Sequence, residues 1–325
     1  MEINKKLSIV IPTYNRADFL DYNLEVHIPM LKEYGIEIAI FDNCSTDNTQ
    51  EVVSKWMKEY DYLTYHKNEI NVGPDANFEK ALKYPNTDYI WLLGDTSKIA
   101  IDTFKSVADE INNKYDLIVI NNSNRVKDIQ SIVYNDANKL LRQLGWHMTQ
   151  MSALIFSKQL INNVSFSRYY DTNFIQTGII FEYLASKEKI NVKWLREYSA
   201  NQLKKEGLVK NSWQSQTFEI WIIRWANFIL SLPPSYNIEN KLYTIKLHNE
   251  ITKLFGIKNL VSLRSKNHFN LKIFFKYYKF FYLALNKYSF IRLFFIALIP
   301  KSIFILLISI VKNKKKLFHY KDKDD

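Results

Sequence analysis

Short apolar runs alternate with segments of helical periodicity along the first 120 residues. The apolar runs predict buried strands, and these runs are Leu7–Ile11, Glu37–Phe41, Leu63–His66, Tyr89–Leu93 and Leu117–Ile120. The segments between them predict helices, near Asp18–Val26, Thr49–Tyr60, Asp75–Lys83 and Ile101–Asn113. Strands that alternate with helices typically form a mostly parallel sheet with helices on both faces. The sequence therefore predicts an α/β fold for this part of the chain.

Proline and polar residues mark the expected ends of these helices. Pro29 should end or kink the first helix, because proline lacks the backbone N–H that the helix interior needs. Asp47 followed three residues later by Gln50 resembles a capping box at the start of the second helix. Pro74 suits the first turn of the third helix.

The pattern is less regular after residue 120, and it becomes helical after residue 210. Apolar runs predict strands at Ser131–Tyr134 and Ser152–Phe156, and helical spacing predicts helices at Ala137–Leu144 and Ile179–Ser186. Longer helical patterns follow, at Gln214–Leu232 and Asn240–Phe255. We therefore expect a first domain over residues 1–210, with halves at 1–120 and 121–210, and a helical region over 211–325.

Composition removes several classes of site. The seven glycines of the 325-residue chain are nowhere closer than 21 residues apart, so no glycine-rich dinucleotide loop or P-loop can be written. Cys44 is the only cysteine, which excludes a disulfide framework and zinc sites with two thiolates. No two of the six histidines lie four residues apart, so a helical zinc-protease site is absent as well.

Polar clusters follow four successive predicted strands. They are Pro12–Arg16, Asp42–Asp47, Asn68–Pro74 and Gly94–Thr96. Residues of these types also form turns and cap helices. In an open parallel sheet, however, ligands bind beyond the carboxyl ends of the strands. Four clusters at four strand ends favour a binding site at one edge of the sheet.

The four clusters lie in motifs that resemble the nucleotide-sugar domain of family-2 glycosyltransferases. The motifs are LSIVIPTYNR, IFDNCSTDNT, NEINVGPDANFEKAL and DYIWLLGDT. They occur in the order and spacing of that family over about residues 5–100, and a looser resemblance continues to about residue 200. The chain is most similar to bacterial surface-polysaccharide transferases whose acidic motif reads Gly-Asp-Asp. The resemblance implies a GT-A fold, a nucleotide-sugar donor and inversion at the anomeric carbon.

The resemblance also implies which residues surround the donor. In chain order they are Pro12, Thr13, Tyr14, Asp42, Asn43, Ser45, Asn71, Gly73 and Asp95. The first three would line the nucleoside pocket, and Asp42 would accept a hydrogen bond from the base, with Asn43 and Ser45 beside it. Asn71 and Gly73 would shape the wall near the ribose. Asp95 would hold a divalent cation, Mg²⁺ or Mn²⁺, on the diphosphate, where a hard cation stabilises the leaving group.

One departure from the family concerns the metal. A second acidic residue usually follows the first at once or two positions later, whereas this chain has Asp95-Thr96-Ser97. We therefore expect a weakly held cation, with water, diphosphate and the Thr96 hydroxyl completing its shell. The alternative is a cation-independent enzyme with a basic residue at the diphosphate, for which Arg16 and Lys98 are candidates.

The second half of the domain should supply the acceptor site and a general base. An inverting transfer needs a carboxylate or histidine within hydrogen-bond reach of the acceptor hydroxyl. The Glu-Asp pair usual in the family is missing from the stretch Tyr169–Thr177. Asp171 is the first candidate base, followed by His147 and Glu182. Asp171 could instead cap the next helix, and the other two could be a packed core histidine and a surface residue.

Positive charge gathers at the end of the chain. Residues 258–325 hold 15 Lys and Arg against three acidic residues, so the net charge of +11 comes from +12 there and −1 elsewhere. Aromatic residues accompany these lysines, and two apolar runs, Leu293–Ile299 and Ile303–Val311, are each too short to span a bilayer. An interfacial helical pair on anionic lipid is expected, and packing on the rest of the protein is the alternative. We predict no nucleic-acid partner, because no such motif is present.

These observations predict an inverting glycosyltransferase, peripheral on the cytoplasmic face of the bacterial plasma membrane. It would move a sugar from a nucleotide-diphosphate donor to a growing, lipid-linked surface glycan of the capsule, O-antigen or teichoic-acid type. A nucleotidyltransferase would need a glycine-rich loop after the first strand, and Pro12–Arg16 contains no glycine. A catalytically weakened sugar-nucleotide-binding or scaffold subunit is the alternative, because Thr96 replaces the second acid.

Overall fold

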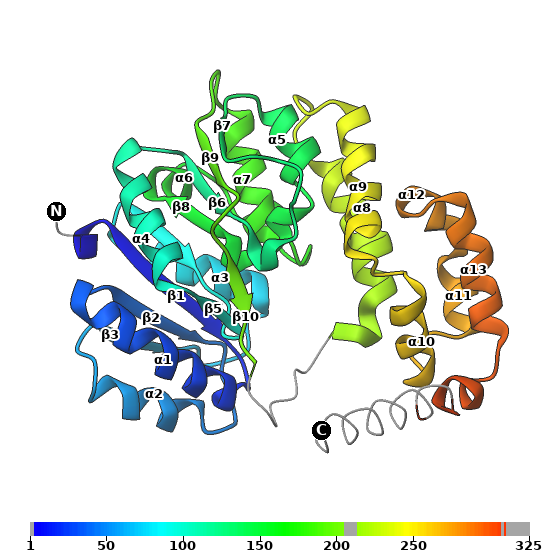
Figure 1. Cartoon of the computed structure of the whole chain (residues 1–325), viewed down its shortest axis with the longest axis horizontal. Coiled ribbons are helices and arrows are strands. Elements are labelled where there is room, and N and C mark those ends of the chain that lie inside the picture. The colour runs from blue at the N-terminus through cyan, green and yellow to red at the C-terminus, as the bar shows by residue number, and fades with distance from the viewer. Residues whose placement is uncertain (1–2, 205–212, 307–308, 310–325) are drawn as a thin grey trace, which may run out of the picture. The chain divides into compact units, whose positions relative to one another are not determined.

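A computed structural model describes residues 3–204, 213–306 and 309 of the chain (Figure 1). The chain divides into two compact units. The first comprises residues 1–210 and 231–241, and the second comprises residues 211–230 and 242–325. The predicted donor and acceptor halves both lie in the first unit, whereas the predicted helical region contributes residues 231–241 to it.

An eight-stranded sheet forms the centre of the described part of the first unit, in the order β3-β2-β1-β4-β8-β6-β9-β7. Six of these strands run in the same direction, and β8 and β7 run against them. The strands are β1 (Leu7–Thr13), β2 (Glu37–Asp42), β3 (Leu63–Lys67), β4 (Tyr89–Leu92), β6 (Leu117–Ile120), β7 (Ile132–Tyr134), β8 (Leu154–Ser157) and β9 (Val192–Leu195). The predicted α/β fold with a mostly parallel sheet is thus confirmed.

Helices cover both faces of this sheet. They are α1 (Ala17–Leu31), α2 (Thr49–Met57), α3 (Pro74–Lys83), α4 (Ile101–Glu110), α5 (Ala137–Leu144), α6 (Lys158–Asn162) and α7 (Ile175–Ala185). The crossovers through α1 and α2 step one way along the sheet, and the crossover through α3 returns past β1 to β4. Since such crossovers are right-handed, α1 and α2 lie on one face and α3 on the other. The strands β1, β4 and β6 are buried on both faces, as their continuous apolar runs predict, whereas the edge strands β3 and β7 are partly exposed.

Three local predictions need correction. The first helix does not end at Pro29, because α1 continues to Leu31 with the proline inside it. Asp47 and Gln50 form no capping box: the N-cap of α2 is Asn48, and Asp47 accepts the backbone N–H and the hydroxyl of Thr49, the first residue of α2, over 3.2 and 2.5 Å. The helix predicted at Ile179–Ser186 begins already at Ile175, as α7, and Asp75 from α3 accepts the backbone N–H of Asn173 just before it.

Three strands escaped the sequence prediction: β9 of the central sheet and two strands of three residues each. β5 (Ser97–Ile99) and β10 (Ala200–Gln202) form a separate antiparallel pair. Ile99 pairs with Ala200, about a hundred positions away, and each strand contains only three residues. A three-residue polar strand has no periodicity to detect, so only its distant partner defines it. This pair continues directly from Thr96, whose carbonyl accepts a bond from Leu203.

The described part of the second unit is helical. A π-helix covers Glu219–Arg224, and the α-helices are α8 (Trp225–Ser231), α9 (Ile238–Thr252), α10 (Ile257–Ser265), α11 (Leu271–Tyr277), α12 (Phe281–Ala284) and α13 (Lys287–Leu298); α8 and α9 each extend partly into the first unit. Phe218 lies at the centre of an aromatic core, with its ring 4.7 Å from Phe269 and 5.1 Å from Phe255. No helix among the described residues is long and apolar enough to cross a bilayer. The lysine-rich stretch 312–316, which belongs to the basic end of the chain, and the end of the second apolar run lie outside the described residues.

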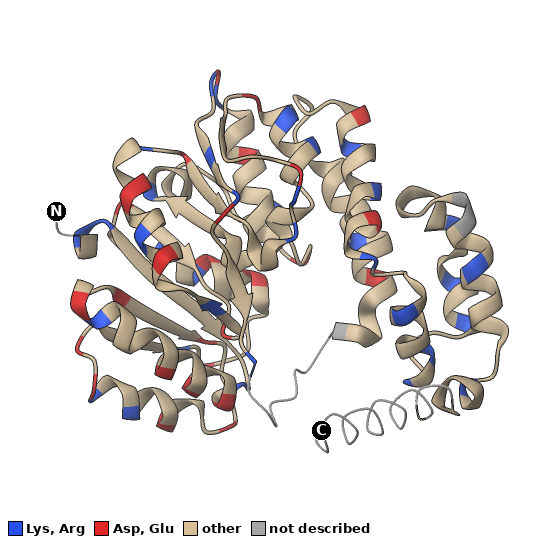
Figure 2. Ribbon diagram, in the orientation of Figure 1, with Lys and Arg blue, Asp and Glu red and all other residues tan. Residues whose placement is uncertain are grey.

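Basic residues predominate in the second unit, as Figure 2 shows. Its described residues include 12 Lys and Arg but only two acidic residues, Glu219 and Glu250, a difference of +10. Acidic and basic residues alternate over the first unit in the same figure. The charge asymmetry read from the sequence therefore belongs to a folded helical unit and not to an extended tail alone.

Candidate donor site at the strand ends

The candidate site forms where the chain changes direction along the sheet. The connections after β1 and β4, which are neighbouring strands, leave the sheet in opposite directions at this point. The predicted clusters therefore meet: Thr13 pairs with Asp42 across the β1–β2 register, and the Thr13 hydroxyl donates to Asp95 over 3.2 Å. Such a switch point is where open α/β sheets bind ligands. Pro12 is buried in β1, while the Tyr14 side chain is exposed beyond it.

Asp42 is completely buried at the end of β2. Its Oδ1 accepts the backbone N–H of Ser45 over 2.8 Å, and its Oδ2 accepts the hydroxyl of Tyr65 over 2.6 Å. Burial and this bond to Asp42 raise the pKa of Tyr65, so its hydroxyl stays protonated. Tyr65, which the sequence analysis missed, therefore covers the carboxylate. Each carboxylate oxygen of Asp42 thus already accepts one hydrogen bond from the protein.

The predicted ribose-side residues form an amide network. The Asn43 side chain donates to Asn71 over 2.9 Å and accepts the backbone N–H of Val72 over 2.9 Å, and Asn71 accepts the N–H of Gly73 over 2.9 Å. Gly73 has φ of +83° and is the N-cap of α3. A Cβ there would meet nothing within 4 Å, so glycine is required by the backbone conformation rather than by space. The asparagines thus fix the loop that leads into α3.

The loops after β1 and β2 are bound to each other. Ser45 accepts the backbone N–H of Asn15 over 2.8 Å, and Asn15 accepts the N–H of Thr46 over 2.8 Å. Asp47 accepts the N–H of Ala17, the first residue of α1, over 3.0 Å. The other carboxylate oxygen of Asp47 accepts the backbone N–H and the hydroxyl of Thr49 at the start of α2, so Asp47 links the loop to both helices. It also fixes Arg16, which lies between Asn15 and Ala17, at the edge of the site.

Asp95 follows β4 and is buried. Its Oδ1 lies 3.0 Å from Nη1 of Arg16, and its Oδ2 accepts the Thr13 hydroxyl. The Arg16 side chain is 30% exposed, so the guanidinium reaches the surface of the site. The second basic candidate, Lys98, is exposed on β5. The positive charge next to Asp95 is therefore supplied by a protein side chain, the guanidinium of Arg16.

The side chains around Asp95 offer the oxygen atoms that a divalent cation prefers, but too few of them to hold it. Carboxylate and hydroxyl oxygens suit Mg²⁺ and Mn²⁺. However, Asp95 is the only acid of its motif, both of its oxygens are engaged, and the described residues contain no group of three metal-binding side chains. The arrangement therefore suits a cation held mainly by a donor diphosphate rather than a preformed metal site.

Two buried residues of α1 fix the Asp95 loop, and the sequence analysis missed both. The Asn23 amide donates to the carbonyl of Asp95 over 3.1 Å and to that of Ser97 over 2.9 Å. The Nε2 of His27 accepts the backbone N–H of Ile99 over 3.1 Å, so the proton is on Nδ1, which faces Asn23. Burial lowers the pKa of His27 to about 4, with a smaller contribution from Lys98. Neutral His27 therefore fixes the end of β5 behind the site.

Asp171 and Asp75 approach each other across the two halves of the domain. Asp75, in the first turn of α3, accepts the backbone N–H of Asn173 over 3.4 Å and also bonds the N–H of Asp171. Burial, with the charge of Asp171 as a smaller cause, raises the pKa of Asp75 to about 6. Asp171 is exposed and has φ of +62°. Asp171, the first candidate base, thus lies next to the start of α3, a helix of the donor half. Asp75 orients the segment that contains Asp171.

The two other candidate bases, His147 and Glu182, interact with other side chains of the protein. His147 is fully buried, and its ring lies 5.4 Å from Trp146 and 5.5 Å from Trp194. Burial lowers the pKa of His147 to about 4. Glu182 forms an ion pair with Arg168 at 3.0 Å and accepts the hydroxyl of Tyr169 over 2.5 Å. His147 cannot reach an acceptor from the core, and Glu182 is committed to its own pair.

The buried histidines predict how stability depends on pH. Both His27 and His147 have a pKa of about 4 in the folded chain, against an ordinary value of 6.5, so the unfolded chain binds protons that the folded chain does not. The free energy of unfolding should therefore fall between pH 6.5 and 4, by about 1.4 kcal/mol per pH unit for each histidine. Asp75, with its raised pKa, works in the opposite direction below pH 6. Urea unfolding at pH 7 and 5 should show a smaller difference in His27→Gln than in wild type; an equal difference would contradict the neutral state of His27.

Residues 8–164 match the sequence profile of the family described as Glycosyl transferase family 2. This stretch, a little under half of the chain, is a domain of that family. The chain is 27% identical over 190 residues to the abequosyltransferase RfbV of Salmonella typhimurium, covering 58% of this chain and 54% of RfbV. It is 26% identical over 111 residues to the GalNAc(5)-diNAcBac-PP-undecaprenol beta-1,3-glucosyltransferase of Campylobacter jejuni, covering 34% of this chain and 36% of that enzyme. The matches thus span about half or less of these relatives.

The structure is also similar to a solved one, TarS of S. aureus in complex with UDP-GlcNAc. The TM-score is 0.52 with 18% sequence identity, and the alignment covers 79% of this chain and 75% of that chain. At this identity the likeness concerns the fold alone. It confirms the GT-A fold that the four motifs implied.

Proposed function

We propose that the protein is an inverting glycosyltransferase that moves a sugar from a nucleotide-diphosphate donor to a growing, lipid-linked surface glycan. The observation that carries the proposal is the meeting of Asp42, Asp95 and Arg16 at the switch point of a family 2 domain. The acceptor class is supported by the similar Campylobacter enzyme, whose name specifies an undecaprenol-linked substrate. The proposal includes the predicted division into a glycosyltransferase domain over residues 1–210 and a helical region over residues 211–325.

The donor would lie across the ends of β1, β2 and β4. Pro12, Thr13 and Tyr14 would line the nucleoside, with the exposed Tyr14 ring available to it. Asp42 would accept a base N–H while it holds the Ser45 loop, since each carboxylate oxygen can accept more than one hydrogen bond. Asn43 and Asn71 would act through the Gly73 loop, whose shape they fix. This arrangement binds and orients the donor.

The leaving diphosphate needs positive charge as its bond to the sugar breaks. Arg16 can supply it, because its guanidinium reaches the surface of the site and can bond two phosphate oxygens. Asp95 would hold a magnesium or manganese ion that the donor brings, and such an ion would stabilise the same charge. Arg16 and the ion would share Asp95, so the strength of the metal dependence follows from their competition.

The acceptor hydroxyl must lose its proton as it attacks the anomeric carbon. Asp171 would take that proton, because it is exposed and belongs to a segment that is bonded to the start of α3 in the donor half. Asp75 would be a positioning residue for this segment. Attack from the side opposite the diphosphate inverts the configuration at the anomeric carbon. The bond to the diphosphate oxygen breaks as the glycosidic bond forms.

Asp42→Asn should weaken donor binding by about 1.5–3 kcal/mol, the contribution of a hydrogen bond to a charged group. The replacement keeps the shape but turns one acceptor oxygen into a donor. Tyr65→Phe is the matched variant, because it removes the hydroxyl that covers Asp42 without changing the carboxylate. Its donor affinity should be equal to or higher than that of wild type. Calorimetry with a panel of nucleotide diphosphates measures both variants.

An unchanged donor affinity in Asp42→Asn would remove Asp42 from the base pocket. A large loss in Tyr65→Phe would instead make the hydroxyl itself the contact with the base. A thermal-shift screen of nucleotide sugars should precede the calorimetry, because a ligand at 100 times its Kd adds about 2.7 kcal/mol of stability. Asn71→Ala serves as a check on the loop, since it should weaken binding through Gly73 without touching Asp42.

We further propose that the second unit binds an anionic membrane surface, which would place the enzyme peripherally on the cytoplasmic face of the plasma membrane. On α13, Ile291, Phe295 and Leu298 are 52%, 57% and 52% exposed. Their spacing of four and three residues puts them on one helix face. An apolar stripe flanked by lysines is typical of helices that lie in the lipid interface. The same unit is rich in basic residues, Lys276 and Lys279 among them.

Replacing Ile291, Phe295 and Leu298 together by serine should reduce binding to phosphatidylglycerol vesicles by about tenfold or more, since the stripe loses its apolar area. Binding of wild type should weaken as salt rises, because exposed charges are screened. Vesicle sedimentation measures both effects. Met57→Ser and Val133→Ser, which remove exposed apolar side chains of the first unit, are the controls. Equal recovery of the triple variant and wild type would exclude the stripe as the contact.

A further inference from the structure

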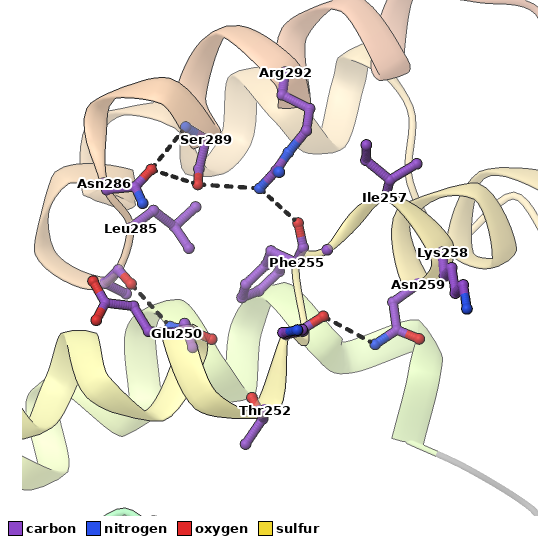
Figure 3. A pocket seen from close by; sticks show the side chains of 14 residues that line it. Glu250, Thr252, Phe255, Ile257, Lys258, Asn259, Leu285, Asn286, Ser289 and Arg292 are labelled. Atoms are coloured by element: carbon purple, nitrogen blue, oxygen red, sulfur yellow. Dashed lines mark hydrogen bonds between the residues drawn. The ribbon is translucent and has the colours of Figure 1, made fainter.

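A cavity of about 580 Å³ lies within the second unit (Figure 3). It is bounded by the end of α9, the start of α10 and the start of α13. All its lining residues belong to this unit, so it is separate from the strand-end site. None of the sequence motifs accounts for it. Its size would admit a small ligand with a charged group.

The cavity is positively charged. Lys253, Lys258 and Arg292 line it against one acidic residue, Glu250. Figure 3 shows Arg292 extending from α13 toward the turn at Phe255 and Ile257. Its Nη2 donates to the Phe255 carbonyl and to the Ser289 hydroxyl, each over 3.2 Å. The guanidinium is therefore held in place at the cavity rather than swinging in solvent.

The first turn of α10 adds a partial positive charge. Gly256 is its N-cap, and no side chain of the described residues caps this turn. The backbone of Gly256 approaches the Lys253 carbonyl so closely that a Cβ would lie 2.8 Å from that oxygen. Ile257, Lys258 and Asn259 follow as the first helical residues, and they line the cavity. Backbone N–H groups in this position are suited to an anion.

Two polar atoms at the cavity are buried without a hydrogen-bond partner in the described part of the chain. One is Oδ1 of Asn249, a residue that is 7% exposed, and the other is Nε of Arg292. Asn249 donates its Nδ2 to the Ala284 carbonyl over 3.0 Å, which fixes Oδ1 as an acceptor. Buried polar atoms left unpaired are costly and call for a partner. Oδ1 of Asn249 therefore needs a hydrogen-bond donor, whereas Nε of Arg292 needs an acceptor.

We propose that this cavity binds a phosphate ester that also carries a free hydroxyl. The phosphate would accept from Nε of Arg292 and from the first turn of α10, beside Lys253 and Lys258. The hydroxyl would donate to Oδ1 of Asn249. An anion without a hydroxyl supplies only the first of these, and inorganic phosphate has its hydroxyl on the phosphorus atom itself. The two unpaired atoms together therefore favour an ester whose hydroxyl is separate from the phosphate. The phosphate of a lipid headgroup and that of a soluble polyol or sugar phosphate share this chemistry.

The test is calorimetric titration of the full chain with glycerol 3-phosphate and, separately, with inorganic phosphate. Glycerol 3-phosphate should bind saturably and more tightly than inorganic phosphate. Arg292→Lys keeps the charge but removes Nε–H, and it should weaken glycerol 3-phosphate by about tenfold or more. Lys258→Gln, which alters an exposed side chain and leaves the fold unaffected, should weaken it by about threefold. Asn249→Leu should reduce the preference for the ester over inorganic phosphate.

Lys272→Gln is the matched control, because Lys272 is a lysine of the same unit that does not line the cavity. It should bind glycerol 3-phosphate as wild type does. Competition by phosphatidylglycerol vesicles, and not by phosphatidylcholine vesicles, assigns the lipid headgroup as the source; its absence assigns a soluble ester. No saturable binding of glycerol 3-phosphate, or an equal loss in Lys272→Gln and Lys258→Gln, would overturn the proposal. Neither outcome depends on sugar transfer.

Discussion

Asp95→Ala should lower sugar transfer by about a hundredfold or more, the usual effect of removing a group that stabilises transition-state charge. Asp95 lies where the donor diphosphate would leave, and it orients Arg16 through the bond at 3.0 Å. Removing the carboxylate therefore disturbs both sources of positive charge, the guanidinium and any cation that the donor brings. Turnover of a radiolabelled nucleotide sugar measures the effect. Asp95→Asn, which keeps the size of the side chain, separates loss of charge from loss of packing.

The metal dependence distinguishes the two roles of this site. If a cation on the donor supplies the charge, wild-type turnover should rise with manganese concentration and vanish in EDTA. The Arg16→Gln variant should then reach half of its maximal turnover at a lower manganese concentration, because Arg16 no longer competes with the cation for Asp95. If Arg16 supplies the charge, turnover should persist in EDTA and Arg16→Gln should lose it. Lys98→Gln, an exposed charge on β5, is the control. Thr96→Asp restores the family's acidic pair and should tighten the manganese dependence.

An unaffected Asp95→Ala would show that this carboxylate serves neither the cation nor Arg16. Donor binding without turnover in wild type, under all metal conditions and with lipid-linked acceptors, would favour the alternative of a sugar-nucleotide-binding subunit. Stability must be followed in parallel, because Asp95 is buried and has partners. The free energy of unfolding should change by only about 1–3 kcal/mol, the cost of leaving Thr13 and Arg16 without this acceptor.

Asp171→Asn should reduce transfer by about 10²–10⁴-fold while donor binding remains, which is the effect expected of a lost general base. The asparagine keeps the size of the side chain but cannot take the proton of the acceptor hydroxyl. Turnover should therefore fall at every pH, whereas the Kd for the donor should stay constant. Glu182→Gln is the matched control, since Glu182 is committed to Arg168 and Tyr169. It should retain most of its turnover.

Asp75→Asn tests whether the segment around Asp171 must be held in place. Asp75 bonds backbone N–H groups of this segment, so its loss should raise the KM for the acceptor more than it lowers kcat. Full activity in Asp171→Asn together with loss in Asp75→Asn would transfer the role of base to Asp75, whose pKa of about 6 suits proton transfer near neutrality. Unchanged turnover in both variants would exclude this segment from the chemistry.

Periodicity in the sequence was sufficient for the framework of the donor half. β1, β2, β3, β4 and β6 all formed where apolar runs predicted strands. Their order placed Thr13, Asp42 and Asp95 at strand ends, because parallel strands carry their following loops to one edge. Pro74 begins α3 as expected. Each of these features depends on residues that are neighbours in the chain, and local patterns record such neighbours.

Tertiary structure alone decided what these residues contact. Tyr65 covers Asp42, Arg16 pairs with Asp95, and Asp75 accepts the backbone N–H of Asn173, 98 positions along the chain. Asn23 and His27 fix the Asp95 loop from within a helix that reads as ordinary core. The cavity of the second unit likewise needs three helices, none of which contains a recognisable motif. A hydrogen bond between distant residues leaves no periodic trace in the sequence, because its geometry depends on how the elements pack.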